Sequence, residues 1–234
     1  MNPHSHSRPF SCFVTGTDTE IGKTLVSCAL LHAFVQSGAR VVGMKPVAAG
    51  AVWREGAWRN DDVEALAAAA SLKFPQELIA PYVLQTPAAP HIAAALDDVK
   101  IDPTHILHCY QQLRDQSDAV VVEGVGGFCV PLTDDFDTAD LAQQLALPVI
   151  LVVGLRLGCI SQALLTAQAI AARGLVLAGW VANTVVTEMA YVPENIQALA
   201  GRLPAPLLGH IPRFAQPSAA LAAACLDFSK VIHV

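Results

Sequence analysis

The sequence has no long apolar run, and this absence excludes one class of protein. Its longest apolar stretches hold about 8–10 residues, whereas a helix that spans a bilayer needs about 20. Residues 1–10, MNPHSHSRPF, also lack the apolar core of a secretory signal, so we expect no export. The sequence therefore predicts a cytoplasmic protein that does not associate with membranes.

Positive charge is scarce as well. Fourteen lysines and arginines stand against 20 aspartates and glutamates, which gives a net charge of −6. A protein that binds nucleic acid or an anionic membrane neutralises phosphates with an excess of basic residues. The composition therefore argues against nucleic acid as a partner.

Paired cysteines are also absent, because no CxxC spacing occurs. Scattered single cysteines among apolar neighbours indicate small buried apolar residues in a reducing cytosol rather than disulfides or a zinc site. His4 and His6 stand alone in a polar segment, so residues 1–9 are expected to be a flexible terminus rather than a metal site. The six cysteines are Cys12, Cys28, Cys109, Cys129, Cys159 and Cys225.

Apolar residues are abundant, and their arrangement predicts the fold class. Hydrophobic residues make up 53% of the chain and charged residues 15%, which favours a large core and little disorder. Continuous apolar runs alternate with helical patterns, as in a parallel sheet that is covered on both faces. We expect one α/β domain over residues 1–234, mainly a parallel β-sheet with helices on both faces. Strands are expected at 10–15, 40–44, 118–122, 147–154, 174–183 and 205–212. Helices are expected at 22–37, 61–71, 103–116, 138–145, 158–173 and 193–202, and irregular loops at 45–62 and around Pro81, Pro87 and Pro90.

Residues 15–24, TGTDTEIGKT, join the first expected strand to the first expected helix. Backbone N–H groups of such a loop and of the helix N-terminus bind phosphate oxygens. Lys23 would add charge at the β- and γ-phosphates, and Thr24 would offer a hydroxyl to Mg²⁺. Residues 17–21 separate Gly16 from Gly22, one more than the usual four. The strand–loop–helix context nevertheless favours a P-loop NTPase-like nucleotide site over a chance GKT.

Two acids in this loop need an explanation. Asp18 and Glu20 would repel phosphate if their carboxylates pointed into the site. We expect them to face solvent, to bind another polar part of the site, or to form hydrogen bonds within the loop.

Three further charged residues follow other expected strands or open a helix. Glu123 ends an apolar strand before Gly124 and Gly126. This position favours a carboxylate that binds Mg²⁺ over an ordinary acid at the end of a strand. Asp62 could serve the same ion or act only as a first-turn helix acid. Lys45 is either an exposed lysine or a cation beside a transferring phosphoryl group.

Taken together, these segments resemble the dethiobiotin synthetase family. The resemblance covers roughly residues 13–214 and rests on VTGTDTEIGKT, GMKPVAAG, RNDD, PHIAA, VVVEGVGG, LPVILVVGLRLGCISQALLTAQAI, LAGWVANTV and APLLGHIP. It implies that ATP, Mg²⁺ and CO₂ or bicarbonate act on 7,8-diaminopelargonic acid. One amine would form a carbamate, the carbamate would be phosphorylated, and the second amine would close the ureido ring.

The resemblance also implies roles for individual residues. Lys45, Lys23 and Thr19 would be catalytic, and Thr24, Asp62 and Glu123 would hold the metal. Asn183 would read the adenine edge through its amide. The nucleotide-binding residues would be Glu20, Ile21, Gly22, Lys23, Thr24, Leu25, Glu123, Gly124, Val125, Gly126, Asn183, Thr184, Pro212, Arg213 and Phe214.

The family is dimeric, so the resemblance implies a homodimer with the substrate site at the subunit interface. Lys45 and Ala49 of one chain would meet Gly158, Cys159 and Ser161 of the other, whose helix start would hold the substrate carboxylate. Ala49 stands where the family often has a serine, and Ser161 where an asparagine is common. Both departures bear on substrate affinity more than on the type of reaction.

Two other interpretations remain open from the sequence. A cobyrinate-type ATP-dependent synthetase begins with a similar loop, but such chains usually carry a further glutaminase domain. A partitioning or switch ATPase would act by binding a partner. Signature-lysine members of that class carry a lysine early in the loop, and residues 17–20, TDTE, have none.

Overall fold

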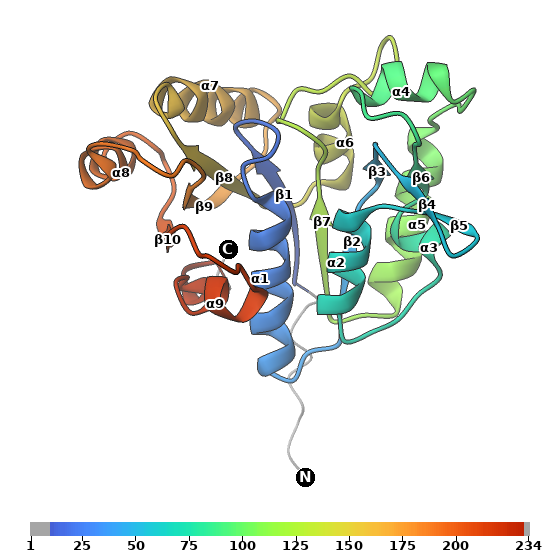
Figure 1. The fold of residues 1–234 in the computed structure, drawn as a ribbon, viewed down its shortest axis with the longest axis horizontal. Coiled ribbons are helices and arrows are strands. Elements are labelled where there is room, and N and C mark those ends of the chain that lie inside the picture. The colour runs from blue at the N-terminus through green and yellow to red at the C-terminus, as the bar shows by residue number, and fades with distance from the viewer. Residues whose placement is uncertain (1–9, 232–234) are drawn as a thin grey trace.

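Six apolar segments form one parallel sheet in the computed structural model, which describes residues 10–231 (Figure 1). The strands lie in the order β10-β9-β8-β1-β7-β2, and all neighbours run parallel. This confirms the predicted fold class. The prediction for residues 1–9, with His4 and His6, lies outside the described residues. The strands are β1 (Phe10–Gly16), β2 (Val41–Met44), β7 (Ala119–Glu123), β8 (Val149–Leu155), β9 (Leu177–Thr184) and β10 (Leu207–Ile211).

The strands are continuous apolar runs because both faces of the sheet are covered. All seven residues of β8 are buried, and successive residues point to opposite faces. Ile150 and Val152 pack in a cluster with residues of α1 and α9, whereas Leu151 and Val153 pack with residues of α7. The helices therefore lie in two layers, as predicted.

One layer holds α1, α2 and α9, and the other holds α5, α6, α7 and α8 (Figure 1). The longest of these, α1 and α7, have 14 residues each. No helix within residues 10–231 is both long and apolar enough to cross a bilayer. The bounds are α1 (Lys23–Gln36), α2 (Asp61–Ala69), α5 (Pro103–Asp115), α6 (Thr138–Leu145), α7 (Cys159–Ala172), α8 (Val192–Ala200) and α9 (Ala219–Ala223).

The prediction of a structureless loop at 45–62 is wrong. This segment contains a short strand, β3 (Val47–Ala48), and a hairpin of β4 (Val52–Arg54) and β5 (Ala57–Arg59). Glu55 and Gly56 form its two-residue turn, both with positive φ, as hairpin turns require. Trp53 and Trp58 face each other across the two strands with ring centroids 5.4 Å apart in an edge-to-face arrangement. Such a cross-strand aromatic pair stabilises strands too short to show an apolar pattern.

The predicted irregular connection holds at Pro81 and Pro87, which lie in bends, but the prediction is wrong at Pro90. Pro90 begins α4 (Pro90–Leu96), where a missing N–H costs nothing because the first helical turn has no internal acceptor for it. The same region holds α3 (Gln76–Ile79) and β6 (Tyr82–Val83), which pairs with β3. The structure also contains two elements that the sequence pattern did not predict, α9 and the 3₁₀ turn Phe228–Lys230.

The cysteines largely follow the prediction. All six are free thiols. Cys12, Cys28, Cys109 and Cys159 are buried, as small apolar side chains in a core are. Cys129 is exposed and Cys225 is half-buried, so burial does not hold for these two.

Candidate functional site

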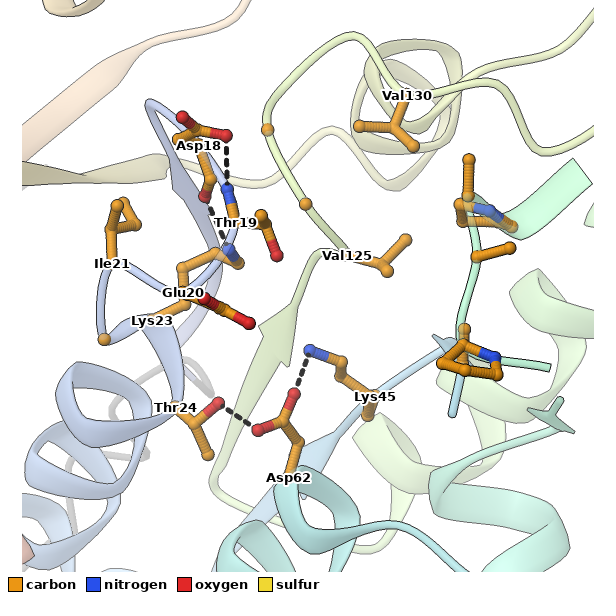
Figure 2. A pocket seen from close by; sticks show the side chains of 18 residues that line it. Asp18, Thr19, Glu20, Ile21, Lys23, Thr24, Lys45, Asp62, Val125 and Val130 are labelled. Carbon is orange, nitrogen blue, oxygen red and sulfur yellow. Dashed lines mark hydrogen bonds and ion pairs between the residues drawn. The ribbon is translucent and has the colours of Figure 1, made fainter. Parts of the chain in front are cut away.

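A cavity of about 800 Å³ lies at the carboxyl ends of the central strands. Parallel sheets bind ligands at this edge, because the loops that leave the strands meet there. The cavity brings together the loop of residues 17–22 after β1, Lys45 after β2 and the glycine turn after β7 (Figure 2). Residues 17–22 are called the phosphate loop below. The residues that line it include Asp18, Thr19, Glu20, Ile21, Lys23, Thr24, Lys45, Ala49, Asp62, Val125 and Val130.

The phosphate loop is held by residues from distant parts of the chain. The N–H of Thr17 donates to the carbonyl of Val152 at 3.0 Å. The amide of Asn183 donates to the carbonyl of Ile21 at 2.8 Å. Gly22 has a φ of +85°, and a Cβ there would lie 2.3 Å from the Asn183 amide nitrogen. Only glycine therefore fits both the backbone conformation and this close contact.

The buried side chain of Ile21 attaches the phosphate loop to the core. Its side chain is 1% exposed and packs where Gly16 and Gly154 leave room, since a Cβ on either glycine would come within 2.5 Å of it. The buried Ile21 side chain belongs to the core. Its role in a nucleotide site would be to seat the loop on the sheet.

Lys23 begins α1 and is 6% exposed. Its ammonium donates to the carbonyl of Asp18 at 2.9 Å (Figure 2). Burial, followed by repulsion from the nearby Lys45 charge, lowers the pKa of Lys23 to about 8. An anion in the cavity would stabilise the charged form of this lysine.

Lys45 lies at the centre of a buried charge cluster. Its ammonium is 2.6 Å from Oε1 of Glu123, 3.0 Å from Oδ2 of Asp62 and 3.2 Å from the carbonyl of Gly124. Lys45 is 3% exposed and Glu123 is fully buried. The sequence left an exposed Lys45 open, and the structure excludes that alternative.

Thr24 joins the two carboxylates of this cluster. Its hydroxyl oxygen lies 2.8 Å from Oδ1 of Asp62 and 2.8 Å from Oε1 of Glu123. A hydroxyl has one proton, so it donates to one of these oxygens at a time. Asp62 stands in the first turn of α2, whose N-cap is Asn60. Asp62 is therefore part of the cavity as well as a first-turn helix acid.

The cluster keeps its charges by mutual contact. Burial disfavours a charged Lys45, but the carboxylates of Glu123 and Asp62 outweigh it and raise the pKa of Lys45 above its usual value. Burial likewise opposes the charge of Asp62, and Lys45 outweighs it and lowers the pKa of that carboxyl. Lys45 and Asp62 thus each stabilise the charged form of the other.

The donor set of this cluster fits a hard divalent cation. Thr24, Asp62 and Glu123 offer oxygen atoms only, and Oε2 of Glu123 is buried with no hydrogen-bond partner among the described residues. Within residues 10–231 no group of three or more His, Cys, Asp or Glu is placed to hold a metal ion. A cation here would therefore rest on two carboxylates, a hydroxyl, and oxygens of phosphate and water, which is the coordination Mg²⁺ prefers.

A second cavity, of about 340 Å³, continues from the phosphate loop. It shares Glu20 and Gly22 with the first, and Glu20 has a positive φ of 55°. The Arg213 guanidinium donates to the carbonyl of Val185 at 2.8 Å and so closes one side. Its lining unites predicted residues from three distant segments: Glu20, Gly22, Leu25, Asn183, Thr184, Pro212, Arg213 and Phe214.

The predicted carboxylate-binding residues do not line either cavity of this single chain. Gly158 is the N-cap of α7 with a φ of +93°. Ser161 is exposed, but the Cys159 side chain is fully buried and its N–H donates to the carbonyl of Arg156. Only the backbone of this helix start and Ser161 could therefore meet a ligand.

Several cavity residues were missed by the sequence analysis. Residues 87–90, Gly127 and Val130 line the first cavity, and Arg156 contacts the Asp18 carboxylate. The motif PHIAA, which begins at Pro90, and the motif VVVEGVGG, which ends at Gly127, are the sequence signals for this part of the cavity.

Comparison with known proteins identifies the family. A family model described as "AAA domain" matches residues 11–220. ATP-dependent dethiobiotin synthetase BioD of Janthinobacterium sp. (strain Marseille) is 62% identical over 224 residues, 94% of this chain and 95% of the relative. The protein of the same name from Aromatoleum aromaticum (strain EbN1) is 57% identical over 220 residues, 94% of this chain and 98% of the relative. The chain belongs to the ATP-dependent dethiobiotin synthetase family.

More distant solved structures share the fold of this dethiobiotin synthetase family member. The MinC:MinD cell division complex of Aquifex aeolicus is 13% identical with a TM-score of 0.56, over 92% of this chain and 94% of that one. A ParA family ATPase from Chlorobium tepidum TLS is 13% identical with a TM-score of 0.55, over 96% and 97% of the two chains. At this identity the likeness describes the fold alone, a P-loop NTPase-like α/β domain.

The buried cluster leads to a prediction about stability. Lys45→Met should lower the free energy of unfolding by about 3–5 kcal/mol, because it leaves the Glu123 charge buried without a cation. Lys45→Met combined with Glu123→Gln should recover much of this loss, since both charges are then absent. Urea denaturation at pH 7 measures both, and Lys100→Met, at an exposed lysine, is the matched control.

The stability that comes from the ion pair of Asp62 with Lys45 should change with pH in a defined direction. The folded pKa of Asp62 is below its ordinary value of 3.8, so the stability from its pair with Lys45 is present above that pH and lost as the pH falls further. The deficit of Lys45→Met relative to wild type should therefore shrink in acid. An equal deficit in the single and double variants would contradict the role of charge.

Proposed function

We propose that this chain is an ATP- and Mg²⁺-dependent dethiobiotin synthetase acting on 7,8-diaminopelargonic acid and CO₂. The observation that carries the proposal is the first cavity, which is lined by Lys23, Lys45, Thr24 and Asp62. Glu123 does not line the cavity but lies buried behind it, in contact with Lys45 and Thr24. Phosphoryl transfer needs positioned cations and charge neutralisation more than covalent chemistry. The names of the relatives, at 57–62% identity over most of the chain, support the choice of substrate.

The proposed reaction has three steps. One amine of the substrate attacks CO₂, forms an N–C bond and loses a proton, which gives a carbamate. A carbamate oxygen then attacks the γ-phosphorus of ATP, and ADP leaves. Finally the second amine attacks the carbonyl carbon of the mixed anhydride and forms the second N–C bond of the ureido ring. The bond between this carbon and the phosphate oxygen breaks, phosphate leaves with the electron pair, and the amine loses a proton.

We assign the binding of ATP to the two joined cavities. The triphosphate would lie on the loop N–H groups and the start of α1, with Lys23 and Thr19 beside it. The base would occupy the second cavity, where the Asn183 amide, Thr184 and Phe214 stand. Glu20 and Gly22 line both cavities, which suits a ligand that extends from one into the other.

Lys45 would stabilise the transferring phosphoryl group. A cation at this place matters most when the carbamate oxygen attacks, because negative charge then builds up on the oxygens of the phosphoryl group that is being transferred. In the structure its ammonium contacts Glu123 and Asp62. Turning toward a bound phosphate would therefore require that another cation neutralise those carboxylates.

Thr24, Asp62 and Glu123 would hold Mg²⁺, which when bound neutralises phosphate oxygens and orients them for in-line transfer. Each residue supplies an oxygen atom, and Oε2 of Glu123 is buried with no hydrogen-bond partner among the described residues. The two carboxylates would release Lys45 for its proposed role at the phosphoryl group.

We further propose that two copies of the chain complete the substrate site. The exposed start of α7 offers N–H groups that have no partner inside the helix, and these suit a carboxylate. Gly158 has open space around its α-carbon, and Leu157 beside it is fully exposed. A second chain could therefore approach this end of the helix.

The free thiols suit the reducing cytoplasm, where we propose that the enzyme works.

The proposed reaction predicts that ATP turnover is coupled to the diamine. ADP release should be slow with ATP and Mg²⁺ alone and should rise at least tenfold with diaminopelargonic acid and bicarbonate. Mass spectrometry should find carbon from labelled bicarbonate in a ring product. ADP formed at full rate without the diamine, or raised only by added protein or DNA, would count against the synthetase and for a switch ATPase.

The metal assignment predicts a changed Mg²⁺ requirement. Asp62→Asn keeps the shape of the side chain but removes a negative ligand, so half-maximal activity should need about tenfold more Mg²⁺. Titration of activity with Mg²⁺ at saturating ATP measures this. Asp61→Asn, at the neighbouring exposed acid of the same helix, is the matched control and should behave as wild type. A normal requirement in Asp62→Asn would leave Asp62 as a helix acid only.

The shared site predicts complementation between two inactive variants. Lys23→Gln should disable the phosphate side, and Ser161→Asp should place an anion where the substrate carboxylate binds. Aspartate suits a helix start, so this variant should fold, and Ser161→Asn is its matched control. Equal mixing in a two-fold dimer gives about half heterodimers with one intact site each, so activity should return to roughly a quarter of wild type.

The mixture should be refolded together and checked for heterodimers by differential tagging. Verified heterodimers that stay as inactive as the single variants would contradict the shared site. The substrate carboxylate would then be held within one chain.

A further inference from the structure

Arg156 lies in the connection between β8 and α7, and its guanidinium forms an ion pair with the Asp18 carboxylate of the phosphate loop. The two connections are adjacent because β1 and β8 pair in parallel, with Gly16 opposite Val152. Both charged side chains are partly exposed, at 39% and 36%. Asp18 lines the first cavity, whereas Arg156 lines neither cavity. Arg156 can therefore act on the cavity only through Asp18.

Asp18 connects this ion pair to the groups that face the cavity. One carboxylate oxygen contacts Arg156, and the other accepts the N–H of Thr19 at 2.8 Å. The carbonyl of Asp18 accepts the Lys23 ammonium at 2.9 Å (Figure 2). The orientation of Asp18 thus bears on two residues that we place beside the phosphates.

The charge of Asp18 would otherwise oppose phosphate binding. A carboxylate in a loop that holds a triphosphate repels it, and at a partly exposed site this repulsion is worth about a factor of ten in affinity. The Arg156 guanidinium removes that repulsion by pairing with the carboxylate. It also holds the carboxylate at the rim of the cavity, on the side of the β8–α7 connection.

We propose that Arg156 is a positioning residue for ATP, which neutralises the Asp18 carboxylate and so removes its repulsion of bound phosphates. This inference rests on the proposed binding of ATP in the first cavity. It goes beyond that function by assigning a role to a residue outside both cavities.

The test is a double-mutant cycle of Arg156→Gln and Asp18→Asn, read by calorimetry of ATP·Mg binding and by steady-state kinetics. Arg156→Gln should weaken ATP binding and raise its KM about tenfold, with a smaller change in kcat and none in the KM for the diamine. Asp18→Asn should bind ATP within about threefold of wild type, since it removes the anion. The double variant should bind as Asp18→Asn does, because no charge is left to neutralise. Arg156→Lys should retain most of the affinity.

Arg173→Gln is the matched control. Arg173 follows α7 at its opposite end and pairs with Asp137 and Asp140 at a similar exposure. It should change thermal stability at most, and leave the KM for ATP unchanged.

Three outcomes would overturn the inference. A double variant as weak as Arg156→Gln would mean that the arginine does not act through Asp18. A raised KM for the diamine instead of ATP would place Arg156 in the substrate site. Asp18→Asn tenfold weaker than wild type would mean that the carboxylate itself is needed. Wild-type protein that binds no ATP would refute the proposed function, which separates the two failures.

Discussion

The buried charge of Glu123 is the constraint on which the site depends. This carboxylate ends a central strand and is wholly removed from solvent, so it needs a cation beside it. Lys45 supplies that cation because β2 and β7 are neighbours, with Met44 opposite Val122, so the residues that follow both strands lie together. The register of two strands therefore decides that these charges meet.

The cluster of Lys45, Glu123 and Asp62 carries one positive and two negative charges, so one negative charge is left over. Such an excess favours a divalent cation, and the Thr24 hydroxyl stands between the two carboxylates. Under the proposed function, the same acids hold the lysine when no metal is bound and hold the metal during catalysis. Lys45 would thereby be available for phosphoryl transfer only when the metal is present.

The phosphate loop takes its shape from the rest of the molecule. Val152, Asn183 and Arg156 all lie more than a hundred residues further along the chain, and each bonds to the loop. Ile21 turns into the core beneath it. These contacts attach the start of the loop to β8, its middle to the β8–α7 connection and its end to β9.

The sequence by itself determined the parallel sheet, because strands buried on both faces are continuous apolar runs, and it determined the strand–loop–helix at residues 15–24. It also singled out Lys45, Asp62, Glu123 and Asn183 as candidates. Only the tertiary structure decided that Lys45 is buried against two acids and that Asp18 pairs with Arg156. The hairpin at 52–59 and the helix that begins at Pro90 also escaped the sequence, since short elements have no clear period. The physical reason is the same throughout: local patterns report the burial of a segment, whereas the partner of a charge depends on strand order and register between segments far apart in the chain.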